Sequence, residues 1–136
     1  MTSKVVYTGG LRTVATHLRS GSVIETDAPV DNHGKGERFS PTDLVATALA
    51  SCILTTIGLG SETHDLNIDG AECNVEKIMA ANPRRISEIK VDLHFPLAAS
   101  YSGKQRTVIE HIANTCPVTQ SLHPDCVISI NFNWPA

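Results

Sequence analysis

Three short runs rich in β-branched residues open the chain. Gly9-Gly10 and Ser20-Gly21 separate them, which is typical of strands joined by tight turns. Further along, the segments 86–95 and 127–134 alternate apolar and polar residues, so each has one buried and one solvated face. The sequence therefore predicts six strands: Lys4 to Tyr7, Leu11 to Leu18, Ser22 to Thr26, Ala71 to Met79, Ile86 to Phe95 and Val127 to Trp134.

The longest helical segment reads SPTDLVATALASCILTTIGLG, residues 40–60. A long polar loop, DAPVDNHGKGERF, precedes it, and loops of this length are often functional. Ser40 is a suitable N-cap, and Pro41 fits the first helical position. Asp43 follows at the third position, where capping geometry and the helix dipole favour an acid. The helix is expected to extend to about Gly58 or Gly60.

Two shorter helices are expected before the last strand. The helical period runs from Lys104 to Asn114, Thr115-Cys116-Pro117 interrupts it, and Val118 to Leu122 continues it. The order of the elements predicts an α+β fold with two main helices. A length of 136 residues suits a single domain, residues 1–136.

The helix at residues 40–60 is apolar almost all round, so it must be buried all round. A chain of this size cannot surround it alone, which predicts a homodimer with this helix at its centre. Asp43 and Cys52 are separated by about 13 Å of helical rise and about half a rotation, so they cannot touch within one chain. An acid from the helix start that assists the thiol must come from the other subunit or through a folded-back loop.

Composition and charge exclude several classes of partner. The net charge is −3 and the basic residues are scattered, so a nucleic-acid partner is not expected. No apolar signal segment opens the chain, and no uninterrupted apolar stretch reaches the roughly 20 residues that span a bilayer. We therefore expect no membrane association and a cytoplasmic location. The six histidines lack metal-ligand spacing, so no metal site is expected.

The chain has four widely spaced cysteines, Cys52, Cys73, Cys116 and Cys126, and no CxxC pair. A lone buried cysteine such as Cys52 is usually a small core residue. Cys116, however, starts a helix, where backbone N–H groups and the dipole stabilise a thiolate. Two helix-associated thiols suit a nucleophile and a resolving cysteine, whereas Cys73 and Cys126 are expected in the core or an interface.

These residues resemble a known family. SPTDLVATALASC at residues 40–52, followed by CPVTQSL at residues 116–122, is similar to the OsmC/Ohr family, named for osmotically inducible protein C and the organic hydroperoxide resistance proteins. The resemblance covers nearly the whole chain and is greatest to the OsmC-like branch with a TDAP loop. It implies an intertwined homodimer with two central helices and an active site at the subunit interface. Members that are enzymes are thiol-dependent peroxidases that act on organic hydroperoxides.

The resemblance also implies roles for the two cysteines. Cys52 matches the peroxidatic cysteine of the family and Cys116 its resolving cysteine. The Cys52 thiolate would attack the hydroperoxide and become a sulfenic acid, and Cys116 would then form a disulfide that an external dithiol reduces. No metal, flavin or other cofactor is implied. In the family an arginine favours the thiolate, and a glutamate directly after the proline at the helix start pairs with that arginine.

This sequence departs from the family pattern at the acid. Thr42 follows Pro41, and the nearest carboxylate is Asp43, which is either a dipole-favoured cap or an assisting acid. We rank Arg38 ahead of Arg12 as the activating arginine, because a loop arginine can swing onto the thiolate. The cysteines favour a peroxidase, whereas Thr42 favours the alternative, a non-enzymatic small-molecule-binding or redox-sensing dimer on the same scaffold.

Overall fold

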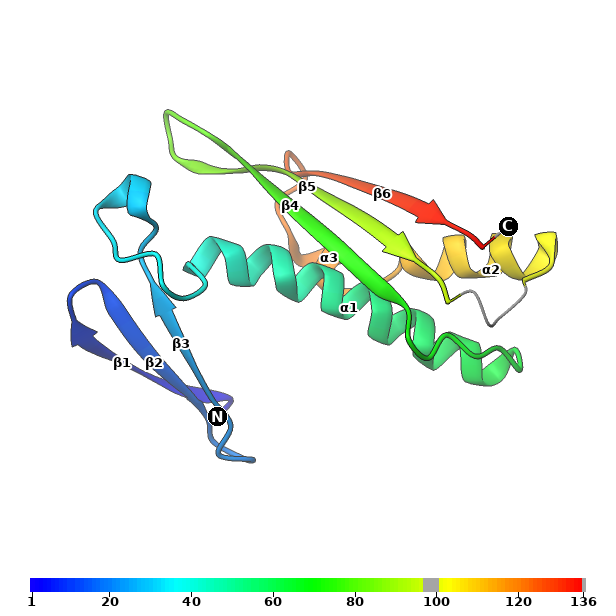
Figure 1. The fold of residues 1–136 in the computed structure, drawn as a ribbon, viewed down its shortest axis with the longest axis horizontal. Helices are drawn as coiled ribbons and strands as arrows, with labels where there is room; N and C mark the ends of the chain where they lie inside the picture. Colours follow the sequence, from blue (N-terminus) through cyan, green and yellow to red (C-terminus); the bar gives the residue numbers. More distant parts are fainter. Residues whose placement is uncertain (97–100, 136) are drawn as a thin grey trace. The chain divides into compact units, whose positions relative to one another are not determined.

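The computed structural model describes residues 1–96 and 101–135 and has the predicted α+β fold (Figure 1). The chain forms two compact units, residues 1–45 and residues 46–136, which we describe separately. The expectation of a single domain over residues 1–136 stays a prediction.

The first unit is built on a three-stranded antiparallel sheet in the order β1-β2-β3. The turn between β1 and β2 contains Gly9 and Gly10, both at positive φ, which glycine adopts without steric cost. The β2–β3 register places Arg12 directly opposite Asp27. The strands are β1 (Ser3–Gly9), β2 (Arg12–His17) and β3 (Val23–Asp27).

The segment between β3 and the first helix is a folded loop with a short 3₁₀ turn, η1 (Val30–Asn32). At its base the Asp27 N–H donates to the Phe39 carbonyl at 3.1 Å. Inside the loop the Gly36 N–H donates to the Ala28 carbonyl at 3.2 Å. A Cβ atom on Gly34 would lie 1.7 Å from that same carbonyl oxygen, so only glycine fits there. The polar loop expected from the sequence is therefore a compact, hydrogen-bonded one.

Helix α1 (Pro41–Thr63) begins as the sequence predicts. The Asp43 N–H donates to Ser40 Oγ at 3.1 Å, and the Ser40 N–H donates to Asp43 Oδ2 at 2.9 Å. This reciprocal pair is a capping box. The helix continues beyond the expected end at Gly58 or Gly60 and ends at Thr63. Gly60 lies inside it, where the absence of a side chain leaves room for Ile112: a Cβ on Gly60 would lie 2.5 Å from Ile112 Cδ1.

The second unit contains a three-stranded sheet in the order β4-β5-β6. β4 pairs antiparallel with β5, and β5 pairs parallel with β6, so the chain between β5 and β6 must cross over. The crossover carries two helices, and α2 begins with a capping box at Ser102 and Gln105. The elements are β4 (Glu72–Ala80), β5 (Arg85–His94), α2 (Gly103–Ala113), α3 (Pro117–Ser121) and β6 (Val127–Asn133).

The hydrophobic core lies between this sheet and the helices, and Figure 1 shows α1 running along the sheet. On β5, Ile89, Val91 and Leu93 face the helices and are buried. One stripe of α1 is buried: Ala46, Leu49, Ala50, Ile53, Ile57 and Ser61. Of these, Ala46, Leu49, Ile53 and Ile57 belong to the core.

The other side of α1 is exposed in the single chain, so burial of the helix all round by a second subunit stays a prediction. Its exposed residues are Thr47, Ala48, Ser51, Thr55 and Leu59. By length and composition alone α1 is apolar enough to cross a membrane, but the core helix of a water-soluble protein passes the same test. The buried stripe identifies α1 as a core helix of its unit.

Candidate functional site

Cys116 is held at the start of α3. It is the N-cap residue of that helix, and its side chain is fully buried. The Thr119 N–H donates to Cys116 Sγ at 3.3 Å, and Thr119 Oγ1 lies 2.9 Å from the same sulfur. Pro117 occupies the first helical position, where its missing N–H costs nothing. The expected thiol at a helix start is confirmed.

Cys52 lies on α1 and is half buried. Its polar contact with Thr56 is loose, with 3.9 Å between Sγ and Thr56 Oγ1. Cys116 belongs to the hydrophobic cluster of the second unit, and Cys52 packs against that cluster. Both thiols are free of disulfide bonds. Two thiols that are 64 positions apart in the sequence thus border one apolar cluster.

Cys73 and Cys126 have more ordinary surroundings. Both are half buried against the same cluster, Cys73 on β4 and Cys126 just before β6. Burial raises the pKa of each thiol above its usual value. A raised pKa lowers the thiolate fraction, so these two cysteines suit structural roles.

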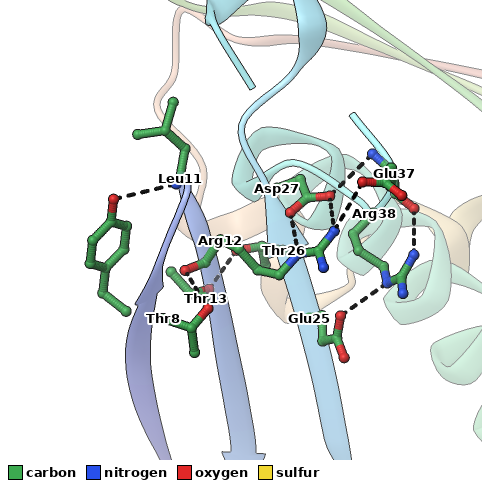
Figure 2. A network of polar contacts seen from close by, with 10 residues as sticks. Thr8, Leu11, Arg12, Thr13, Glu25, Thr26, Asp27, Glu37 and Arg38 are labelled. Atoms are coloured by element: carbon green, nitrogen blue, oxygen red, sulfur yellow. Dashed lines mark hydrogen bonds and ion pairs between the residues drawn. The ribbon is translucent and has the colours of Figure 1, made fainter. Parts of the chain in front are cut away.

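The first unit contains a buried ion pair between Arg12 and Asp27 (Figure 2). The Arg12 Nε and Nη2 groups donate to the two carboxylate oxygens of Asp27 at 2.7 and 2.9 Å. The Asp27 side chain is fully buried, and the backbone N–H of Glu37 donates to it at 3.1 Å. The pKa of Asp27 lies below its usual value. The hydrogen bonds from Arg12 lower it most, the charge of Arg12 and the Glu37 N–H lower it further, and together they outweigh burial, which raises it. Asp27 is therefore an ionised anchor for the loop that follows β3.

Arg38 makes a more exposed ion pair in the same unit. Its Nε donates to Glu25 Oε2 at 3.1 Å, and its Nη1 donates to the Glu37 carbonyl at 3.0 Å. Figure 2 shows Glu37 between the two arginines, with its carboxylate 3.5 Å from Arg12 Nη2. The structure thus gathers Arg12 and Arg38 in one network, each with a carboxylate of its own.

Asp43 lies in the capping box of α1 together with Ser40, so its capping role is observed. Thr42 takes part in the same helix start, where its Oγ1 is 3.2 Å from Ser40 Oγ. The structure leaves the expected catalytic roles of Asp43, Arg12, Arg38, Cys52 and Cys116 as predictions.

Two residues of this arrangement were not identified from the sequence. Asp27 was assigned to the loop, yet it ends β3 and faces Arg12 across the hairpin. Opposite charges on neighbouring strands are a signal for such a pair, once the register is known. Thr119 sits three residues after Cys116. An N-cap side chain accepts a hydrogen bond from the backbone N–H at this spacing, and that is the signal for Thr119 in the sequence.

A hollow of about 470 Å³ lies on the sheet of the second unit. Polar side chains from three strands line it, among them Glu76, Lys90, Asp92 and Asn131. Among the described residues, no group of three or more His, Cys, Asp or Glu side chains is arranged to hold a metal ion.

The two α+β units and the four free cysteines define a thiol-containing α+β protein without disulfide bonds. Residues 34–131 match the protein-family model OsmC, described as OsmC-like protein. The chain therefore belongs to the OsmC family. No match was found among curated proteins.

Solved structures agree with this family. The chain is similar to a putative osmotic stress induced and detoxification response protein from Psychrobacter arcticus, with 48% identity, a TM-score of 0.94 and coverage of 98% of this chain and 96% of that chain. OsmC from Legionella pneumophila, an organic hydroperoxide resistance protein, shares 13% identity with a TM-score of 0.76, covering 98% and 97%. OhrB of Bacillus subtilis, an organic hydroperoxide resistance protein, shares 14% identity with a TM-score of 0.66, covering 98% of each chain. The last two show the fold alone.

Proposed function

We propose that this protein is a thiol-dependent peroxidase that reduces organic hydroperoxides to alcohols. The observation that carries the proposal is the pair of free thiols, Cys52 and Cys116, at one apolar cluster, with Cys116 fixed at a helix cap. Membership of a family whose solved structures include hydroperoxide resistance proteins supports it. An apolar environment also suits the organic part of such a substrate.

In the proposed reaction the Cys52 thiolate attacks the terminal peroxide oxygen. An S–O bond forms, the O–O bond breaks, and the leaving alkoxide takes a proton to become the alcohol. The Cys116 thiolate then attacks the sulfur of the Cys52 sulfenic acid, so that an S–S bond forms and hydroxide leaves as water after protonation. An external dithiol reduces the disulfide by exchange. Arg12 and Arg38 are the candidate cations that favour the thiolate.

The reaction is tested by adding one equivalent of cumene hydroperoxide to the reduced protein. We expect each chain to lose two thiols, a disulfide to join the peptides that contain Cys52 and Cys116, and one equivalent of alcohol to form. Peptide mass spectrometry and thiol titration measure these changes. Retention of all four thiols with no loss of peroxide would contradict the proposal.

The alternative is a non-enzymatic binding or redox-sensing protein, and the arginine contacts favour it. Arg12 is engaged by Asp27 and Arg38 by Glu25, while Thr42 stands where the family has its glutamate. A binding protein without thiol chemistry would keep its thiols and consume no peroxide, whereas a peroxidase consumes peroxide as long as a dithiol reduces its disulfide. Steady-state peroxide loss in the presence of dithiothreitol therefore separates a peroxidase from a binding protein.

We also propose that the protein is a homodimer. In the first unit, all of whose residues the structure describes, the buried side chains are polar: Thr26, Asp27 and Ser40. Its strands instead expose large apolar side chains, and such a small sheet needs a covered apolar face to be stable. A second copy would also cover the exposed side of α1. The exposed apolar residues on or beside the strands are Val5, Val6, Tyr7, Leu11, Leu18, Val23 and Ile24.

Light scattering tests the homodimer. We expect a mass of twice the 14.6 kDa chain at micromolar concentration. A mass of 14.6 kDa at micromolar concentration would contradict it.

The free thiols further suit a reducing compartment, so we propose a cytoplasmic location.

A further inference from the structure

We infer that Thr119 is a positioning residue that holds the Cys116 sulfur ready for disulfide formation; this inference rests on the proposed peroxidase function. It concerns the second half of the reaction and leaves the oxidation of Cys52 to other groups.

The geometry at Cys116 places two polar groups of one residue on one sulfur. The backbone N–H of Thr119 lies 3.3 Å from Sγ and its hydroxyl oxygen lies 2.9 Å from Sγ. The cysteine backbone is fixed as well, because its carbonyl accepts the Gln120 N–H at 3.2 Å. With the thiol fully buried, water cannot replace these partners.

The hydroxyl of Thr119 can serve both protonation states of the sulfur. A hydroxyl is both donor and acceptor, and its hydrogen rotates to suit its neighbour. The oxygen accepts from the S–H group of the thiol, and after deprotonation the O–H group donates to the thiolate. The sulfur therefore keeps its position when it loses its proton, and the backbone N–H of Thr119 can donate to it in both states.

The two thiols differ in this respect. Cys52 also has a threonine nearby, but its contact with Thr56 is 3.9 Å, a full ångström longer than that of Cys116 with Thr119. The shorter contact is made by Cys116, the cysteine to which we assign the resolving role. Removing the Thr119 hydroxyl should consequently slow the attack of Cys116 on the sulfenic acid and leave the attack of Cys52 on the peroxide unchanged.

Thr119→Val tests this, because valine has nearly the same shape but no hydroxyl. After one equivalent of cumene hydroperoxide, we expect disulfide formation to slow at least about tenfold, which corresponds to the lower end of the range for one hydrogen bond to a charged group. The Cys52 sulfenic acid should accumulate and be trapped by dimedone, as mass spectrometry would show. The second-order rate of Cys52 oxidation should stay within about twofold of wild type. Thr119→Ser, which keeps a hydroxyl, should restore the rate of disulfide formation.

Ser121→Ala is the matched control. Ser121 lies on the same short helix and its hydroxyl donates to the Pro117 carbonyl at 2.8 Å, away from the sulfur. This variant should form the disulfide at the wild-type rate. Circular dichroism confirms folding, and Thr119→Ala gives the same comparison if the valine variant does not fold.

Three results would overturn the inference: a wild-type rate in Thr119→Val, an equally slow Thr119→Ser, or an equally slow Ser121→Ala. Any of these, with wild-type protein still reducing peroxide, rejects the role of Thr119 and keeps the proposed function. Wild-type protein that neither consumes peroxide nor forms the disulfide rejects both.

Discussion

Replacing Cys52 with serine should reduce hydroperoxide consumption to the rate measured without protein. A serine hydroxyl is not ionised near neutral pH and cannot form a sulfenic acid, so both the first bond and the later disulfide are lost. The loss of cumene hydroperoxide with dithiothreitol, followed at equal protein concentrations, measures the effect.

Cys73→Ser is the matched control for this variant. Cys73 is a half-buried thiol of the same unit, and burial raises its pKa, so its removal should leave the rate close to wild type. Equal rates for wild type and Cys52→Ser would show that turnover does not depend on this thiol. A loss of activity in Cys73→Ser alone would identify Cys73 on β4 as the nucleophile instead of Cys52.

Replacing Asp27 with asparagine should strongly destabilise the first unit. An amide cannot accept both guanidinium hydrogen bonds and carries no charge, so Arg12 would keep a poorly exposed cation without its carboxylate. The variant should show a lower midpoint in urea unfolding and earlier proteolysis within residues 28–39, whose base Asp27 anchors. Wild-type resistance in both measurements would mean that the ion pair contributes little.

Glu25→Gln is the control for Asp27→Asn. It removes one negative charge from the same strand, but its pair with Arg38 is largely exposed, and such pairs contribute little to stability. We expect its urea midpoint to stay near that of wild type. Similar losses in the two variants would point to net charge as the cause rather than to burial.

The contribution of Asp27 to stability also depends on pH. The folded-state pKa of Asp27 lies below the unfolded value of about 3.9. The contribution is therefore fully present above about pH 4 and is lost as the pH falls through the lower folded-state pKa. The difference in stability between wild type and Asp27→Asn should be largest near neutral pH and should shrink below about pH 4. A constant difference down to about pH 2 would contradict the ionised buried pair.

Local sequence signals predicted most of the secondary structure. Ser40, Pro41 and Asp43 marked the start of α1 because a capping box involves neighbours in the sequence, and the structure has that box. The end of α1 was placed too early because glycine usually weakens a helix. Gly60 is explained by Ile112 on α2, and that contact between distant residues has no local signal.

The site could be predicted only in part. The helix-start position of Cys116 follows from Pro117. The pairing of Cys52 with Cys116 rests on the family resemblance, since nothing in their spacing brings them together, and it stays a prediction. The Arg12–Asp27 pair depends on the β2–β3 register, which a loop assignment for Asp27 concealed. Sequence reasoning sought a carboxylate partner for an arginine at the start of α1, whereas the structure supplies one from the end of β3.

The parallel pairing of β5 with β6 has a consequence for biosynthesis. Cys116 lies in the crossover between these strands, and β6 leaves the ribosome after every other described element. In a nascent chain that stops before Val127 the second sheet consists of the β4–β5 hairpin without its third strand, and a two-stranded hairpin contributes little stability in water. The apolar cluster that contains Cys116 is thus completed only after β6 has been made, because Ile128, Ile130 and Phe132 of that strand pack against it.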